Sequence, residues 1–228
     1  MIFKDQYDPS FGRKSVFTIC ITISVSLSIL LMFSDHLPSF TWLQPYQISG
    51  DFVRRILIAA CLIIYFLRLQ VTVWIFQKRF WTWLETITIS ILMTFALFVF
   101  AKVGGNNKLG VGIIEMIGVL LYLSGSCINT FSESARHVWK LKAENKGRLY
   151  TGGLFGLAMH INYFGDILLF TGFAMITHRP GVYIIPLAMT VNFIFNIIPL
   201  LDRYLEKKYG DEFRDYSKKT KKLIPLIY

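Results

Sequence analysis

The sequence predicts an all-α polytopic membrane protein with about six to seven transmembrane helices and both termini in the cytoplasm. The chain is 54% hydrophobic and 16% aromatic, with a mean hydropathy of +0.50 over 228 residues. Long uncharged runs recur along it, each close to the ~20 residues that cross the hydrocarbon layer. Basic residues gather beside these runs, more often on one side of the membrane than on the other.

Six segments are long enough to span a bilayer. From the N-terminus they are roughly residues 15–33, 53–77, 83–101, 110–131, 154–177 and 181–201. We expect each to be helical throughout, because unpaired backbone amides have no water to bind inside the bilayer. A polar stretch precedes the first run and no small-residue cleavage pattern follows it, so a retained helix is favoured over a signal peptide. No internal repeat or linker divides the chain, and one membrane-embedded domain over 1–228 is expected.

The net charge of +10 indicates contact with a membrane and not with a nucleic acid, because nearly all Lys and Arg lie next to apolar segments. With the N-terminus inside, 18 basic residues fall in the cytoplasm and three outside, which agrees with the positive-inside rule. The three outside are Lys102, Lys108 and Arg179. We therefore predict an integral multi-pass protein, of the endoplasmic reticulum if eukaryotic or of the inner membrane if bacterial, with no nucleic-acid partner and no obligate protein partner.

The three cysteines indicate neither a disulfide framework nor a zinc site. Cys20, Cys61 and Cys127 lie singly in apolar segments, without a Cys-x-x-Cys pair. No metal is expected, and packing is the simplest role for all three.

The most informative stretch is 151–166, which carries polar side chains inside an apolar segment. His160, Asn162, Tyr163 and Asp166 fall within two helical turns. A strongly polar group near the bilayer centre costs about 2.5–3.5 kcal/mol on insertion scales, so such a group usually has a function. A neutral His bonded to a backbone carbonyl would also be satisfied, and His160 is left open between the two interpretations.

Two further sets of polar residues follow helical spacing. Tyr65, Arg68 and Arg79 are expected on or near one face of the second helix, and Arg68 is too deep to reach the interface easily. Asn129, Glu133, Arg136 and Lys140 form a stripe from the bilayer to the cytoplasmic surface. Guanidinium groups match phosphates, and amides or carboxylates can hold ribose hydroxyls. The alternative is that Arg79, Arg136 and Lys140 are ordinary lipid anchors.

These residues resemble a known family. Gly152-Gly-Leu-Phe, followed by Asn162-Tyr-Phe-Gly-Asp166, resembles the signature of the steroid 5α-reductases and the related sterol C14-reductases. Leu37-Pro-Ser-Phe40, Tyr65-Phe-x-Arg68 with Arg79, Asn129 with Glu133, and the end of the chain from Tyr204 through Lys208-Tyr-Gly to Tyr228 resemble it as well. Met159, Leu200 and Leu201 stand where sterol C14-reductases carry Arg, Arg and Asp.

The resemblance implies an NADPH-dependent reductase that transfers hydride to a carbon–carbon double bond of a steroid or other lipid. Residues 15–101 would form the substrate side and residues 110–228 the cofactor side. Tyr65, polarised by His36 or Asp35, would stabilise the developing enolate, and the choice between His36 and Asp35 stays open. The expected NADPH-binding residues are Arg68, Arg79, Asn129, Glu133, Lys140, Asn162, Asp166 and Tyr204. No Gly-x-Gly-x-x-Gly occurs, so a Rossmann domain is not expected.

Two other functions remain as alternatives. Membrane methyltransferases of the isoprenylcysteine or phospholipid type, which use S-adenosylmethionine, resemble the C-terminal half but usually carry Arg-His-Pro-x-Tyr. This chain has Met159-His-Ile-Asn-Tyr163 and a lone Asp202. The third alternative is a lipid-binding membrane protein that keeps the fold without catalysis.

Overall fold

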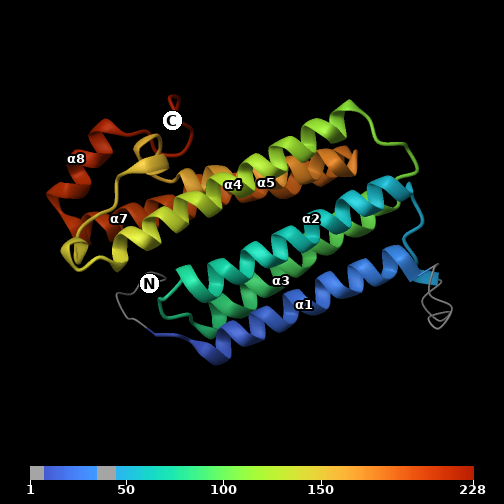
Figure 1. Ribbon diagram of the computed structural model, residues 1–228, viewed down its shortest axis with the longest axis horizontal. Helices are drawn as coiled ribbons and strands as arrows, with labels where there is room; N and C mark the ends of the chain where they lie inside the picture. The colour runs from blue at the N-terminus through green and yellow to red at the C-terminus, as the bar shows by residue number, and fades with distance from the viewer. Residues whose placement is uncertain (1–7, 35–44) are drawn as a thin grey trace. The chain divides into compact units, whose positions relative to one another are not determined.

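The computed structural model describes residues 8–34 and 45–228, drawn as the coloured ribbon in Figure 1. In this part of the chain every regular element is helical and no strand is assigned, so the predicted all-α class is confirmed. Five of the described helices are long and apolar enough to cross a membrane, and a shorter apolar helix accompanies them. The five are Phe11–Phe33, Phe52–Phe76, Trp83–Gly104, Ile113–Leu141 and Pro180–Tyr209, and the shorter one is Ile161–Thr177.

The first three helices follow the predicted apolar runs. They are α1 (Phe11–Phe33), α2 (Phe52–Val71) and α3 (Trp83–Val99), and α1 packs against both of the others. Each of α2 and α3 continues into a turn of π-helix, Thr72–Phe76 and Phe100–Gly104 respectively. α2 alone already has 20 residues, and the continuation brings α3, which has 17, to the length that a bilayer needs.

Local sequence decides where α2 and α3 begin. The Asp51 carboxylate accepts a hydrogen bond from the backbone N–H of Arg54 at 2.9 Å, and Thr82 Oγ1 accepts one from Glu85 N–H at 3.1 Å. Each side chain satisfies one of the backbone donors that a helix leaves unpaired at its N-terminus. Both starts therefore agree with the sequence within a residue.

The second half of the chain contains five further helices. They are α4 (Ile113–Leu141), α5 (Ile161–Thr177), α6 (Ile184–Asn192), α7 (Ile198–Tyr209) and the short α8 (Asp211–Lys219). A π-turn at Phe193–Ile197 joins α6 to α7 and ends two residues before Pro199. Proline has no N–H to donate to the preceding turn, which is a common cause of such a local change in winding.

The chain divides into two compact units. The first comprises residues 1–122 and 171–185, and the second comprises 123–170 and 186–228. α4 and α5 are each divided between the two units.

The first unit buries a charged network at the N-terminal ends of α2 and α4. Arg54 is fully buried, and its guanidinium donates to Glu115 Oε1 at 2.9 Å and to the carbonyl oxygens of Leu109 at 3.1 Å and of Ile176. Glu115 Oε1 lies 2.6 Å from His178 Nδ1. Because a buried charge is tolerated only when it is paired and hydrogen-bonded, these contacts account for Arg54 as a structural residue.

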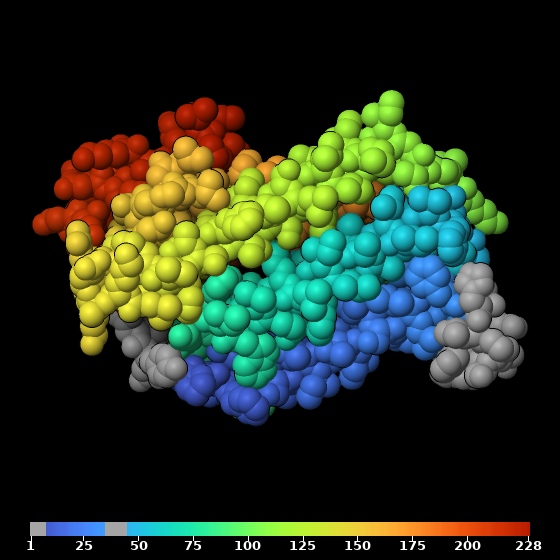
Figure 2. All heavy atoms as spheres, in the orientation of Figure 1, coloured from blue at the N-terminus to red at the C-terminus, as the bar shows by residue number. Residues whose placement is uncertain are grey.

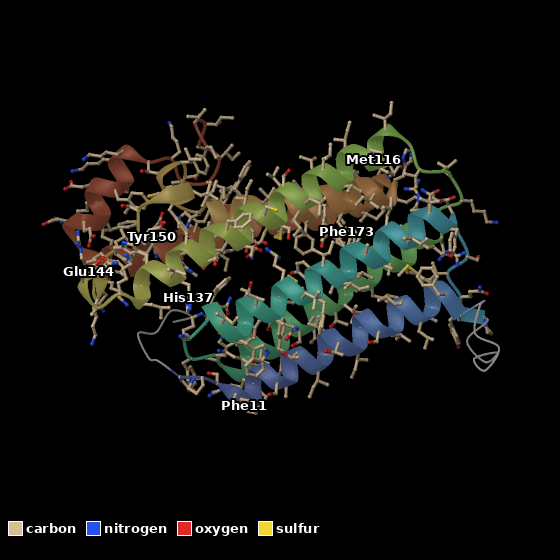
Figure 3. The ribbon with its side chains drawn as sticks, viewed as in Figure 1. Phe11, Met116, His137, Glu144, Tyr150 and Phe173 are labelled. Atoms are coloured by element: carbon tan, nitrogen blue, oxygen red, sulfur yellow. The ribbon has the colours of Figure 1, made fainter. Side chains whose placement is uncertain are left out.

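Aromatic and hydroxyl contacts complete the core of this unit. Phe100 and Phe173, the latter labelled in Figure 3, stack with ring centroids 4.3 Å apart. The Tyr122 hydroxyl donates to the carbonyl oxygen of Cys61 at 2.6 Å. A buried tyrosine usually needs such an acceptor, so Tyr122 ties α4 to α2 within the core.

Glycines allow α4 and α5 to touch backbone to backbone. In the first unit a Cβ on Gly118 would lie 2.8 Å from the carbonyl oxygen of Gly172, and in the second a Cβ on Gly165 would lie 2.8 Å from the carbonyl oxygen of Gly125. Small residues at helix interfaces are what permits this approach in membranes. The spacing of seven residues in each helix keeps both pairs on one face.

The fifth predicted helix begins later than expected, at Ile161 and not at residue 154. The helix of the fourth apolar segment, expected to span the membrane over 110–131, continues to Leu141 and carries the predicted stripe to Lys140. The reason for the late start of α5 is tertiary: Met159 N–H and His160 N–H donate to the carbonyl oxygens of Lys221 and Lys222, at 2.7 and 2.8 Å. Those bonds to the end of the chain replace the helical ones.

Candidate cofactor site

The signature stretch folds as a short turn, an extended step and a helix. Residues Gly153–Gly156 form one turn of 3-10 helix, Ala158 bridges to Lys221, and α5 follows. Gly153 has a φ of +56°, a conformation that an L side chain rarely adopts. The stretch thus presents its polar residues at the start of a helix and not in the middle of one.

An amide and carboxylate cluster joins α4 to the start of α5. The Asn129 side-chain amide donates to the carbonyl oxygen of Asn162 at 3.0 Å, and the Asn162 side-chain amide donates to Glu133 Oε1 at 2.9 Å. Asn129 and Glu133 are buried, each with 6% of its surface exposed. These three residues, predicted together from the sequence, are brought together by the structure.

The close glycine contact explains this geometry. A Cβ on Gly165 would lie 2.8 Å from the backbone nitrogen of Asn129. Only a glycine lets α4 come so close at this point. The approach places the Asn129 and Asn162 side chains within one hydrogen bond of the opposite helix.

Arg136 adds a partly exposed positive charge to the cluster. Its guanidinium forms an ion pair with Glu133 and lies over the Phe155 ring at 5.6 Å from the centroid. The Arg136 side chain is 39% exposed, whereas the Glu133 side chain is 8% exposed. A guanidinium that is paired on one side and exposed on the other can donate hydrogen bonds to an oxyanion ligand.

Two lysines and two tyrosines lie further along the same side of α4 and on α7. Lys140 Nζ donates to the Tyr209 hydroxyl at 3.1 Å, and Lys208 Nζ donates to the Tyr204 hydroxyl at 3.2 Å. Both ammonium groups also lie over the Tyr209 ring, at 5.7 and 5.6 Å from its centroid. Lys140 and Lys208 are exposed, so two positive charges meet on one aromatic ring at the surface.

His160 has an acidic partner that was not predicted from the sequence. Its Nε2 lies 2.8 Å from Asp202 Oδ1, and Lys222 Nζ lies 3.4 Å from Asp202 Oδ2. The His160 ring is buried and stacks on Tyr163, which stacks in turn on Phe193. A separation of 42 residues between His160 and Asp202 leaves no local pattern, and only their unusual polarity in apolar surroundings marks them.

The end of the chain anchors the signature turn. The Tyr216 hydroxyl donates to the carbonyl oxygen of Phe155 at 2.5 Å. Burial raises the pKa of Tyr216 above its ordinary value, so the hydroxyl stays a neutral donor at physiological pH. Together with the backbone bonds from Met159 and His160, this contact ties α8 and the residues after it to the turn before α5.

The other predicted cofactor residues of this unit, Asp166 and Tyr204, are half-buried. Asp166 lies on α5 one turn after Asn162, and Tyr204 lies on α7. Their role in cofactor binding stays a prediction.

The remaining predicted residues belong to the first unit or lie outside the described residues. Tyr65 is buried, its hydroxyl 3.3 Å from Met93 Sδ, and the Arg68 guanidinium lies over its ring at 5.2 Å. Arg79 forms an ion pair with Glu85 beyond the end of the α2 helix. The expectation that Arg79 continues the helical face of Arg68 is wrong, because the helix ends at Phe76 after a π-turn. Asp35 and His36 lie outside the described residues.

The family described as "Protein of unknown function (DUF1295)" matches residues 38–220. The chain is 27% identical to the Delta(14)-sterol reductase of Neurospora crassa in an alignment of 167 residues that covers 56% of this chain and 34% of that protein. It is 30% identical to 3-oxo-5-alpha-steroid 4-dehydrogenase 1 of Rattus norvegicus over 114 residues, 49% of this chain and 41% of that protein.

A third relative carries the name of another reaction. The chain is 30% identical over 102 residues, 43% of its length and 35% of the relative's, to the protein of Ustilaginoidea virens named "Probable O-methyltransferase ustE". The chain thus spans between 34% and 41% of the length of these three relatives. The match over residues 38–220 covers most of the chain, which belongs to the DUF1295 family and is similar to the steroid 5α-reductases.

Proposed function

We propose that this protein is a membrane reductase that transfers hydride from NADPH to a carbon–carbon double bond of a steroid or another lipid. The observation that carries the proposal is the cluster of Asn129, Asn162, Glu133 and Arg136. It joins amide, carboxylate and guanidinium groups at one point between two membrane helices. Similarity to a sterol reductase and to a steroid 4-dehydrogenase supports the same reaction class.

The cluster suits the nicotinamide half of a dinucleotide. Glu133 and the two asparagines can bind ribose hydroxyls and a carboxamide, and Arg136 can bind a phosphate with the open side of its guanidinium. NADPH, when bound, supplies the hydride, so the protein has to provide position and electrostatics. Asp166 and Tyr204 are proposed to complete the set, as expected from the sequence.

The stripe on α4 has a length that fits an extended dinucleotide. Asn129 and Lys140 are eleven residues apart on one face, which corresponds to about 16 Å along the helix axis. Lys140 lies with Lys208 against Tyr209 at the surface end of this stripe. Two ammonium groups at that end can bind the additional phosphate of NADPH, and we propose that they favour NADPH over NADH.

Hydride transfer to a conjugated double bond places negative charge on the carbonyl oxygen of the substrate. A hydroxyl that donates to this oxygen stabilises the enolate, and Tyr65 is the proposed donor, assisted by His36 or Asp35. Arg68 and Arg79 stay predicted contributors to phosphate binding. Within the first unit, the nearby Arg68 guanidinium favours any negative charge that develops at Tyr65.

The test uses detergent-purified full-length protein, incubated anaerobically with NADPH and a panel of 3-oxo-4-ene steroids and enoyl lipids. Mass analysis should detect a gain of two hydrogens in one class of substrate. NADPH should also raise the melting temperature, since a ligand that binds only the folded state stabilises it. An unchanged melting temperature with NADPH, together with no reduced product, would contradict the proposal.

A variant pair tests the placement of the cofactor. Asn162→Ala removes the amide that bonds Glu133, whereas Asn196→Ala removes an exposed amide elsewhere in the second unit. We expect Asn162→Ala to weaken NADPH binding about 10–100-fold, which is the worth of one or two hydrogen bonds to charged or polar groups. Asn196→Ala should bind NADPH as the parent does. Equal affinities of the two variants would exclude this placement.

A second pair tests the phosphate end. In Lys140→Gln and Lys208→Gln the preference for NADPH over NADH should fall about tenfold, because a charge-assisted bond to the additional phosphate is lost. Lys207→Gln, an exposed neighbour on α7, serves as the control. A preference that stays unchanged in both test variants would show that other residues read this phosphate.

A membrane methyltransferase is the second candidate, favoured by the similarity to the relative named as an O-methyltransferase. It would bind S-adenosylmethionine, whose ribose could use the same carboxylate and amides. The melting experiment separates the two, because S-adenosylmethionine and not NADPH would then raise the melting temperature. Stabilisation by neither ligand would favour the non-catalytic alternative.

A further inference from the structure

An open groove lies at the C-terminal end of α4, within the second unit. Its volume is about 580 Å³, and its lining consists of five side chains of α4, from Phe131 to Trp139, with Lys142 and Tyr150 from the segment that follows. Tyr150 and the end of α4 can be followed in Figure 3, and the side chains of this part of α4 reach the surface in Figure 2.

The groove and the candidate cofactor site use different faces of α4. Phe131, Ala135 and Val138 follow helical spacing, and they lie about half a turn from the stripe of Glu133 and Arg136. The groove is therefore a separate feature, which the proposed function does not explain.

The position of the groove on the helix is unusual for a spanning segment. α4 has 29 residues, whereas about 20 are enough to cross the hydrocarbon layer. The uninterrupted apolar run ends near Phe131, yet the groove face stays apolar beyond it, with Phe131 66% and Val138 57% exposed. An amphipathic extension of this kind presents its apolar surface at the boundary between the acyl chains and the lipid headgroups.

The chemistry of the groove changes along its length. Exposed apolar side chains come first, then Trp139 and Tyr150, whose ring centroids are 5.3 Å apart, and finally Lys142. Tryptophan and tyrosine prefer the membrane interface, and lysine prefers the phosphate level. The lining thus changes from apolar to aromatic to cationic toward the end of α4, in the order in which acyl chains, ester groups and phosphates follow one another in a leaflet.

We propose that this groove binds an anionic phospholipid from the leaflet at this end of α4. The acyl chain lies along Phe131 and Val138, the ester region lies against Trp139 and Tyr150, and the headgroup phosphate pairs with Lys142. Charge complementarity selects the occupant, because the lining contains one cation, Lys142, and no acidic side chain.

The experiment measures quenching of tryptophan fluorescence by brominated lipids in reconstituted full-length protein. The signal of Trp139 is the difference between the parent and Trp139→Phe. Brominated phosphatidylglycerol should quench this difference signal with about a fivefold preference over brominated phosphatidylcholine, which is what one lysine near an anionic headgroup supplies. The preference should disappear in Lys142→Gln and persist in Lys146→Gln, an exposed control outside the lining.

Each other outcome overturns the proposal. Equal quenching by the two lipids in the parent, or equal loss of preference in both lysine variants, would mean unselective lipid contact. Absence of quenching by either lipid would mean that a protein surface covers the groove. The exposed Lys142 side chain has no packing role, so melting curves of Lys142→Gln and the parent should coincide and exclude misfolding. The readout requires no reductase activity and is independent of the proposed function.

Discussion

Each of the two units contains an ion pair between an arginine and a glutamate of α4. The arginine is fully buried in the first unit and partly exposed in the second. In the first unit Arg54 and Glu115 have side chains that are 0% and 2% exposed, and protein carbonyl oxygens accept further hydrogen bonds from the two terminal nitrogens of the arginine. In the second unit Glu133 is similarly buried, but the Arg136 side chain is 39% exposed. A charge surrounded by protein partners stabilises the fold, whereas a charge with an open side is available to a ligand.

The surroundings of the two pairs support this distinction. Glu115 accepts from the backbone N–H of Gly112 at 2.7 Å as well as from Arg54, so it fixes the start of α4. Glu133 accepts from a side-chain amide, Asn162, which is itself half-buried. Removing a partner should therefore damage stability in the first unit and ligand binding in the second.

The largest effect is expected for Glu115→Gln. The substitution keeps the shape of the side chain but leaves Arg54 as a buried charge without its carboxylate. Breaking a buried pair in this way costs about 3–5 kcal/mol, which for a chain of this length lowers the melting temperature by about 10 °C. Thermal unfolding of the detergent-purified variant measures the loss.

Glu144→Gln provides the matched control, because Glu144 is an exposed glutamate, labelled in Figure 3. Its melting temperature should match that of the parent. If Glu115→Gln were as stable as this control, the first network would not be structural and the contrast between the units would be lost.

Tyr65→Phe tests whether the first unit contributes chemistry in addition to stability. The change removes only the hydroxyl, and the ring stays packed beside Arg68. We expect turnover to fall about 10²–10⁴-fold, the usual contribution of a positioned proton donor. NADPH affinity and melting temperature should hardly change, since the hydroxyl is expected to act on the substrate.

Steady-state kinetics with the substrate found in the reductase assay provide the measurement. Tyr46→Phe, which removes an exposed tyrosine hydroxyl from the first unit, is the control. If Tyr65→Phe retained parental turnover, Tyr65 would be a packing residue, and the acid would have to be sought at Asp35, His36 or Tyr163.

The contrast between the units also explains what the sequence could predict. Hydropathy and length identified the apolar helices, because a bilayer leaves the backbone no other choice. Helical spacing placed Asn129 and Glu133 on one face, and the polar residues within an apolar segment assigned Asn162 to the same candidate site. Both inferences depend on local pattern, and the structure agrees with both.

What could not be predicted depends on contacts between distant segments. The start of α5 moved to Ile161 because residues after α8 take the backbone donors of Met159 and His160. Asp202 reaches His160 only through the fold of α7. Arg79 does not lie on the expected face because the helix ends after the π-turn at Thr72–Phe76. The apolar pattern of these residues does not predict a change in winding.

Gly125→Ala should produce an intermediate effect by separating α4 from α5 in the second unit. A Cβ at Gly125 would meet the Gly165 carbonyl oxygen and lie 3.0 Å from the Leu168 Cβ. Overpacking of this kind costs about 1–3 kcal/mol. Because Asn129 is one turn away, NADPH affinity should fall as well, and both effects can be followed by melting curves with and without NADPH.

Gly110→Ala is the control for this substitution, because nothing lies within 4 Å of a Cβ at Gly110. A Gly125→Ala variant that behaved like Gly110→Ala would show that the helices can separate slightly without loss. The close approach of the two backbones would then not be what positions the amide cluster.

The smallest effect is expected for Asp202→Asn. This variant tests whether charges contribute less to stability in the second unit than in the first. The variant keeps an oxygen 2.8 Å from His160 Nε2 and loses only the charge facing Lys222, which is 3.4 Å away and 47% exposed. A partly exposed ion pair is worth about 0–1 kcal/mol, so the melting temperature should fall by no more than about 2–4 °C. The backbone bonds that hold Lys221 and Lys222 are unaffected by the change. A fall as large as that of Glu115→Gln would mean that the charges of the second unit hold the fold together as firmly as those of the first.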